Sequence, residues 1–125
     1  MNFELELASS IDAAAEARRA LDGMQDGLPE QRMRDVRLLV SELVTNAVRH
    51  AGLAAGDPIR LAIDAHDGCL RVEIADRGSG FVPSAPEPDP ARASGWGLFL
   101  VDELADRWGV ELADPGTLIW FEVDR

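Results

Sequence analysis

Alternating apolar and polar residues mark five short segments of the chain as β-strands. In residues 3–7, for example, the three apolar side chains would share one face of the strand. The other strands are predicted at residues 59–65, 69–75, 108–113 and 118–123. Turn residues at 66–68 predict a β-hairpin, and a second turn at 114–116 would join the last two strands.

An alanine-rich segment and two segments with helical spacing of apolar residues predict three helices. They are expected at residues 11–24, from 28 to about 51 and from 95 to about 107. Ser9 or Ser10 is expected to cap the first helix. Pro29 suits the first turn of the second helix, which Gly52 would end.

The predicted order is one strand, two helices, two strands, a loop, one helix and two strands. Because hairpin-joined strands alternate with helices that can gather on one face, this order predicts an α+β two-layer sandwich with a mostly antiparallel sheet. Residues 83–94 contain four prolines and almost nothing that could pack in a core, which predicts the loop. We find no internal repeat and no second domain, so residues 1–125 are expected to form a single domain.

Composition narrows the range of functions. The hydrophobic fraction of 46% and the charged fraction of 28% are ordinary for a soluble domain. The net charge of −11 argues against nucleic acid as a partner, because a phosphate backbone requires a basic surface. No apolar run approaches the ~18 residues of a membrane span, and the first residues do not resemble a signal peptide. With one cysteine, Cys69, the chain is expected in a reducing cytoplasm and away from membranes.

The predicted second helix carries an unusual polar stripe. Glu42 and Asn46 lie four residues apart, one turn above each other, and Arg49 continues the stripe three residues later. The apolar residues of the helix form a separate face. A carboxylate, a carboxamide and a guanidinium would therefore lie beside a core-facing surface, where the alternative interpretation is an ordinary solvated helix face.

A glycine-rich stretch, residues 76–80, follows the third predicted strand directly. Asp76 would project from the end of that strand, and an ionised carboxylate only accepts hydrogen bonds. It could therefore accept from the amino group of adenine and would disfavour the carbonyl of guanine. Gly78 and Gly80 would let a ring pack closely against the backbone. The alternative is a simple turn, since Asp and Gly are common turn residues.

A second glycine-rich stretch, Gly95–Leu98, opens the last predicted helix after the proline-rich loop. Backbone N–H groups at a helix amino end form a good phosphate site, and glycines allow close approach. A plain junction between loop and helix is the alternative interpretation. The spacing matches neither the Walker pattern nor the Rossmann pattern.

Together, Glu-x-x-x-Asn on a helix, Asp-x-Gly-x-Gly after a strand and Gly-x-Gly-Leu opening a helix resemble the GHKL, or Bergerat, ATP-binding domain. Gyrase, a heat-shock chaperone, histidine kinases and mismatch-repair ATPases share this domain. The chain is also similar to the small stand-alone anti-sigma-factor serine kinases of bacteria. The segments that carry this similarity are Ser41–Ala47, Gly97–Val101, Ala105–Gly109 and Gly116–Phe121.

The resemblance implies that one helix holds both the metal ligand and the base. Asn46 would offer its carbonyl oxygen to Mg²⁺, which keeps several waters and takes phosphate oxygens. Glu42 would accept the proton from the attacking hydroxyl or orient a water. Arg49 would approach a phosphate, or remain a solvated surface residue.

The resemblance also implies an adenine pocket. Asp76 would read the base, and Thr117 would complete the contact to it. Gly78 and Gly80 would line the pocket.

For the phosphates, the resemblance implies a cradle made by Gly95 and Gly97 with Leu98, and an ATP lid at about residues 81–95. Ser94 stands where such proteins often carry another glycine, and four prolines stiffen the lid. Both departures leave open whether ATP binding is accompanied by turnover.

The function implied by the resemblance is that of a regulatory serine/threonine kinase that uses ATP and Mg²⁺. It would phosphorylate a small, STAS-like anti-sigma antagonist protein and bind a sigma factor. The alternatives are an ATP-binding interaction module without kinase turnover and a histidine kinase catalytic domain separated from its partner. A homodimer stays open, because the sequence does not define an interface.

Overall fold

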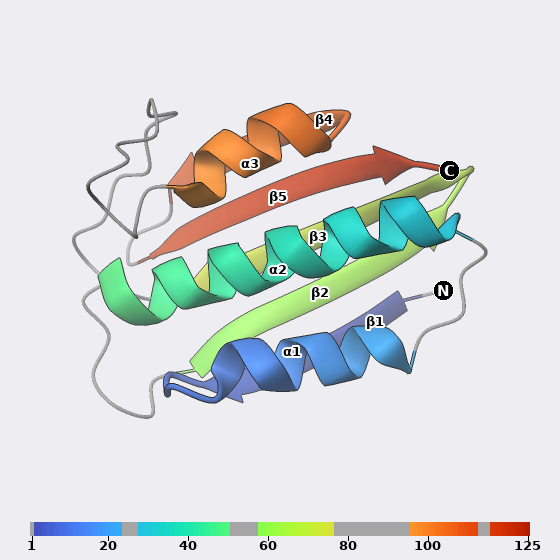
Figure 1. The fold of residues 1–125 in the computed structure, drawn as a ribbon. Helices are drawn as coiled ribbons and strands as arrows, with labels where there is room; N and C mark the ends of the chain where they lie inside the picture. Colours follow the sequence, from blue (N-terminus) through green and yellow to red (C-terminus); the bar gives the residue numbers. More distant parts are fainter. Residues whose placement is uncertain (1, 24–27, 51–57, 77–95, 113–115) are drawn as a thin grey trace.

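The computed structural model describes residues 2–23, 28–50, 58–76, 96–112 and 116–125. These residues form two layers, a five-stranded sheet and three helices that lie along one of its faces (Figure 1). The arrangement confirms the predicted α+β sandwich.

The elements follow one another as β1 (Asn2–Ala8), α1 (Ala13–Asp22), α2 (Glu30–His50), β2 (Pro58–His66), β3 (Cys69–Asp76), α3 (Trp96–Leu104), β4 (Arg107–Leu112) and β5 (Thr117–Asp124). In the sheet the strand order is β1-β2-β3-β5-β4, and every pairing among them is antiparallel. The predicted turn at 114–116 lies mostly outside the described residues, as does the end of α2 predicted at Gly52.

The core lies between the sheet and the helices. Alternate residues of each strand point to opposite faces, so Ile59, Leu61 and Ile63 of β2 are buried, while Arg60 lies on the open face. Helix α2 crosses the middle of the sheet and buries seven apolar side chains (Figure 1). They are Met33, Val36, Leu39, Val40, Leu43, Val44 and Ala47.

The predicted β-hairpin between β2 and β3 is confirmed. His66 pairs with Cys69, which leaves a two-residue turn. Asp67 and Gly68 both have positive φ, at 48° and 75°. Two successive residues in this region are typical of the type I′ turn, whose twist matches that of the flanking strands.

The prediction of Ser9 or Ser10 as the cap of the first helix is wrong, and so are its predicted limits. Asp12 takes the N-cap position, and α1 covers ten residues from Ala13. The Ser10 hydroxyl instead accepts a hydrogen bond from the Asp12 N–H at 3.3 Å, outside the helix. Both serines belong to the bend that follows β1, so the helix begins later than its alanine content suggests.

The last helix ends at Leu104, three residues earlier than predicted. The Asp106 N–H donates to the Glu122 carbonyl at 2.9 Å, and Arg107 already pairs with Glu122 in the sheet. The Arg107 guanidinium donates to the carboxylates of Glu122 and Asp124 at 2.7 and 2.6 Å. These hydrogen bonds hold the pKa of both carboxyl groups below its usual range. Sheet pairing therefore overrides the helical spacing at this point.

A stack of three residues on the open face explains the glycine in the Trp-Gly pair of β4. Gly109 faces Trp120 of β5, and a Cβ on Gly109 would lie 2.7 Å from the Trp120 indole nitrogen. The Arg71 guanidinium lies over the same Trp120 ring, with its central carbon 4.3 Å from the ring centroid. The ring thus occupies the space that any larger residue at position 109 would need.

We therefore expect Gly109→Ala to lower the free energy of unfolding by about 1–3 kcal/mol, because the indole must leave its place on Arg71. Urea denaturation followed by far-UV circular dichroism measures the change. Gly23→Ala is the matched control, since Gly23 has helical φ and its new Cβ would meet only the Ala20 carbonyl at 3.5 Å. Equal stability of Gly109→Ala and the unsubstituted protein would contradict this account of the stack.

Candidate functional site

Two of the predicted site residues meet across the sheet. Asp76 ends β3, Thr117 begins β5, and the register makes them direct partners. Asp76 lies two residues after buried Ile74, and Thr117 lies two residues before buried Ile119. Because residues two apart in a strand point to the same face, both side chains point toward the helix-covered face. Thr117 is only 5% exposed and Asp76 is half-buried. The sheet therefore places a carboxylate beside a buried hydroxyl at one of its ends.

Glu42 and Asn46 lie on the flank of α2 that faces α3. Both are half-buried beside the core-facing stripe, whereas Arg49 is exposed. Arg32 of the same helix shows which way this flank faces. At ~100° per residue around the helix axis, Glu42 and Asn46 both lie within roughly 80° of Arg32. Arg32 donates to the carbonyl of Leu104 at the end of α3, at 3.3 Å. The opposite flank faces α1.

Two contacts mark that opposite flank. The Ser41 hydroxyl accepts from Arg18 of α1 at 3.0 Å. The Arg37 guanidinium donates to Asp22 of α1 at 2.7 Å. One flank of α2 thus packs against α1 through these contacts, and the opposite flank carries Glu42 and Asn46.

Four element ends gather at one end of the molecule. The carboxyl ends of α2 and β3 and the amino ends of α3 and β5 lie at the same end of the sheet (Figure 1). Gly97 and Leu98 lie in the first turn of α3, where backbone N–H groups have no partner within the helix. The structure therefore brings the segments that carry Glu42, Asn46, Asp76 and Thr117 toward the amino end of α3.

Three of the predicted glycines, Gly78, Gly80 and Gly95, lie outside the described residues, as does the predicted lid at 81–95. For Gly97 and Leu98 the structure describes the helical backbone alone. The roles predicted for all five remain predictions.

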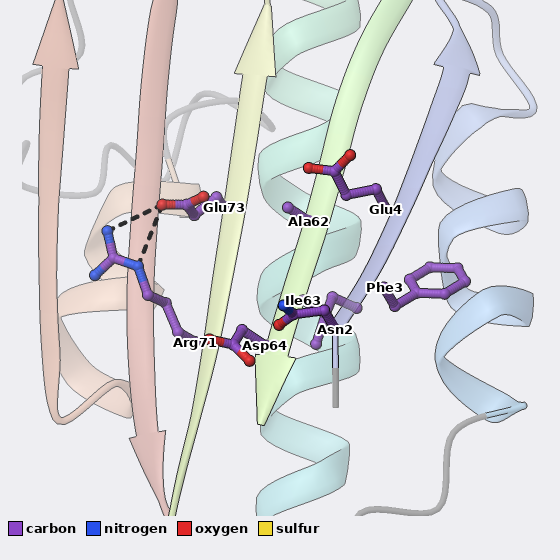
Figure 2. A pocket seen from close by; sticks show the side chains of 8 residues that line it. All are labelled: Asn2, Phe3, Glu4, Ala62, Ile63, Asp64, Arg71 and Glu73. Carbon is purple, nitrogen blue, oxygen red and sulfur yellow. Dashed lines mark hydrogen bonds and ion pairs between the residues drawn. The ribbon is translucent and has the colours of Figure 1, made fainter. Parts of the chain in front are cut away.

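A hollow on the open face of the sheet is lined by none of the predicted site residues (Figure 2). Its charged lining includes Arg71 and Glu73, which pair with each other at 3.1 Å. It is lined by Asn2, Phe3, Glu4, Ala62, Ile63, Asp64, Arg71 and Glu73. Because its cation is already paired, the hollow offers little to an anionic ligand.

Within the described ranges, no three His, Cys, Asp or Glu side chains converge as a metal cluster would require. In the same part of the chain, no helix is both long and apolar enough to span a membrane.

Sequence reasoning missed the residues that fasten α3 at its far end. Arg32 binds atoms of residues 104, 106 and 124, which are 72 to 92 positions away along the chain. The Trp108 indole N–H donates to Asp102 of α3 at 3.0 Å. The sequence does contain the Asp-x-Trp-Gly pattern at 106–109, but its structural role depends on these distant partners.

Comparison with known proteins identifies the fold and the family. Residues 7–123 match the family described as the histidine kinase-like ATPase domain. The chain belongs to this family. The match covers nearly the whole chain and confirms the resemblance to GHKL proteins.

Two relatives of the chain are named as a serine-protein kinase and an anti-sigma factor. The serine-protein kinase RsbW of Oceanobacillus iheyensis is 30% identical over 119 residues, which cover 83% of this chain and 75% of that protein. The anti-sigma F factor of Pasteuria penetrans is 28% identical over 125 residues, which cover 91% of this chain and 83% of that protein.

Two solved structures are similar in fold. The RsbU and RsbW domains of a Mycobacterium tuberculosis protein match with a TM-score of 0.76 and 25% identity, over 99% of this chain. The blue-light activated histidine kinase of Erythrobacter litoralis matches with a TM-score of 0.62 and 24% identity, over 89% of this chain. This chain spans only 32% and 39% of those two chains.

Proposed function

We propose that the chain is an ATP-dependent serine/threonine protein kinase of the anti-sigma-factor type. It phosphorylates a serine on a small, STAS-like anti-sigma antagonist protein and binds a sigma factor. The names of the relatives at 28–30% identity support the kinase and the sigma-factor partner. One observation supports the proposal most strongly. Asp76 and Thr117 pair at one end of the sheet, and the carboxyl end of α2 lies at that same end.

Adenine recognition is assigned to Asp76 and Thr117. The Asp76 carboxylate accepts a hydrogen bond from the exocyclic amino group of the base. Thr117 lies opposite it, buried at 5% exposure, and its hydroxyl can both donate and accept. Gly78 and Gly80 stand two and four residues after Asp76 in the sequence, and in this proposal they would line the base pocket.

Mg²⁺ is assigned to Asn46, whose half-buried carboxamide lies on the flank of α2 that faces α3. Its carbonyl oxygen suits Mg²⁺, a hard cation that completes its shell with waters and phosphate oxygens. When bound, Mg²⁺ neutralises charge on the phosphates. In this proposal the phosphates would bind at the amino end of α3, held by Gly95, Gly97 and Leu98, with Arg49 as a further phosphate contact and residues 81–95 as the lid.

Glu42 is assigned as the base. The serine hydroxyl oxygen of the partner attacks the γ-phosphorus of ATP while the bond from that phosphorus to the bridging oxygen of ADP breaks. The hydroxyl proton passes to the Glu42 carboxylate, and ADP leaves with the electron pair of the broken bond. Glu42 lies one turn from Asn46, so the base is close to the proposed metal ligand.

Replacing Glu42 by Gln keeps the shape of the side chain and removes the proton acceptor. We expect nearly unchanged ATP affinity and phosphoryl transfer slower by roughly 10²–10⁴-fold, since the base acts mainly in the transition state. Transfer of labelled phosphate from ATP to a candidate STAS-like antagonist protein measures the rate. Glu30→Gln, at the far end of α2, is the control and should transfer normally. Undiminished transfer by Glu42→Gln contradicts the assignment, and no transfer by unsubstituted protein that binds ATP favours an interaction module without turnover.

The Asp76 assignment predicts selectivity for the base. The unsubstituted protein should prefer ATP to GTP by about 1–3 kcal/mol, because guanine would leave a buried polar group without a partner. Asp76→Asn should reduce this preference, since its amide can donate to the guanine carbonyl. Competition binding measures both, and Asp64→Asn on the open face serves as the control. GTP competing as well as ATP against the unsubstituted protein would rule the assignment out.

Asn46→Ala should abolish the Mg²⁺-dependent part of ATP binding and leave the fold intact, because Asn46 lies beside the buried stripe of α2. Calorimetry with Mg²⁺ and with excess chelator separates the two contributions. Gln31→Ala removes another carboxamide from the same helix and should bind as the unsubstituted protein does. The metal role is wrong if Asn46→Ala retains full affinity in the presence of Mg²⁺.

A further inference from the structure

Arg32 lies in the first turn of α2 and forms a 3.7 Å ion pair with Asp35 of the same helix, but its other contacts lie outside α2. Its guanidinium donates to the Leu104 carbonyl at 3.3 Å and to the Asp124 carbonyl at 3.2 Å, and it pairs with the Asp106 carboxylate. The side chain is only 26% exposed. A cation at the amino end of a helix is unfavourable for that helix, so the helix dipole of α2 does not account for this arginine.

Helix α3 benefits from this cation. It has nine residues, which is too short for independent stability, and no basic residue stands in its last turn. That turn instead carries Asp102 and Glu103, whose negative charges interact unfavourably with the negative end of the helix dipole and destabilise the helix. Arg32 supplies the missing positive charge and a donor for a carbonyl at the end of α3.

The same contacts tie α3 to the sheet. The Asp106 carboxylate accepts from the Asp124 N–H at 2.7 Å as well as from Arg32. The Asp106 N–H donates to the Glu122 carbonyl at 2.9 Å. The carboxyl end of α3 is therefore fixed to the last residues of β5, the strand that begins with Thr117.

We propose that Arg32 is a positioning residue, which sets the place of the phosphate-binding end of α3 by fastening its opposite end. This inference rests on the proposed nucleotide site. The helix extends roughly 12 Å from Trp96 to Leu104, so a tilt at the fastened end moves its amino end relative to α2. Adenine recognition depends on β3 and β5 instead. Loss of Arg32 therefore weakens phosphate binding at the amino end of α3 and leaves adenine binding unchanged.

Arg37 offers a matched control. It lies on the opposite flank of α2 and pairs with Asp22 of α1 at 2.7 Å. Its replacement also removes an ion pair between α2 and another element, but on the side away from α3. A general loosening of α2 would follow from either substitution, whereas displacement of α3 follows only from loss of Arg32.

The experiment compares ATP and adenosine binding to the full chain by calorimetry with Mg²⁺, at a temperature where circular dichroism shows every variant folded. Arg32→Ala should bind ATP about tenfold more weakly, because a small misplacement of the amino end of α3 weakens its contacts to the phosphates. Its adenosine affinity should be unchanged. Arg37→Ala should leave both affinities unchanged. Arg32→Lys should recover part of the ATP affinity, since it restores the charge without the planar fork of donors.

Three results would overturn the inference: unchanged ATP affinity in Arg32→Ala, equal loss of ATP and adenosine affinity, or the same loss in Arg37→Ala. If Arg32→Ala does not fold, Arg32→Lys carries the comparison, with a smaller loss for ATP and none for adenosine expected. Unsubstituted protein that binds neither ligand contradicts the proposed nucleotide site itself, and the inference falls with it. That result differs plainly from a variant that binds as well as the unsubstituted protein.

Discussion

Helix α2 must bury one stripe against the sheet while it holds a carboxylate and a carboxamide at the edge of that stripe. The stripe includes Val36, Leu39, Val40 and Leu43, each at most 1% exposed, so the helix can neither rotate nor slide without exposing core. The burial that stabilises the domain therefore also fixes the direction in which the polar flank points. In the proposed site, catalytic geometry is a consequence of core packing.

The sheet and α3 complete this arrangement from the two ends of the molecule. At one end, strand register places Asp76 opposite Thr117. At the other end, Arg32 joins the start of α2 to the end of α3 and to the last strand. Because α2 and α3 run in opposite directions, the start of α2 lies at the same end of the sheet as the end of α3 (Figure 1). The proposed site thus depends on interactions at both ends of the sheet.

Most of the fold could be predicted from the sequence, because strand alternation and the stripe of α2 reflect burial on one face. The pairing of Asp76 with Thr117 followed only from the register, since 41 positions separate them along the chain. Helix ends were predicted less well. Ser10 competes with the helix for a backbone N–H, and sheet pairing at Asp106 and Arg107 stops α3 before its apolar spacing ends. The contacts of Arg32 left no local signal in the sequence.

In the proposed site, Mg-ATP binds at the end of the sheet where α2 and β3 end and α3 and β5 begin. Backbone amide chemical shifts recorded by NMR during a titration with Mg-ATP would locate the bound nucleotide. Binding at this end should produce the largest changes at Glu42, Asn46, Asp76, Gly97 and Thr117. Changes concentrated instead on the open face of the sheet, at Glu4, Ala62 and Glu73, would rule the proposed site out.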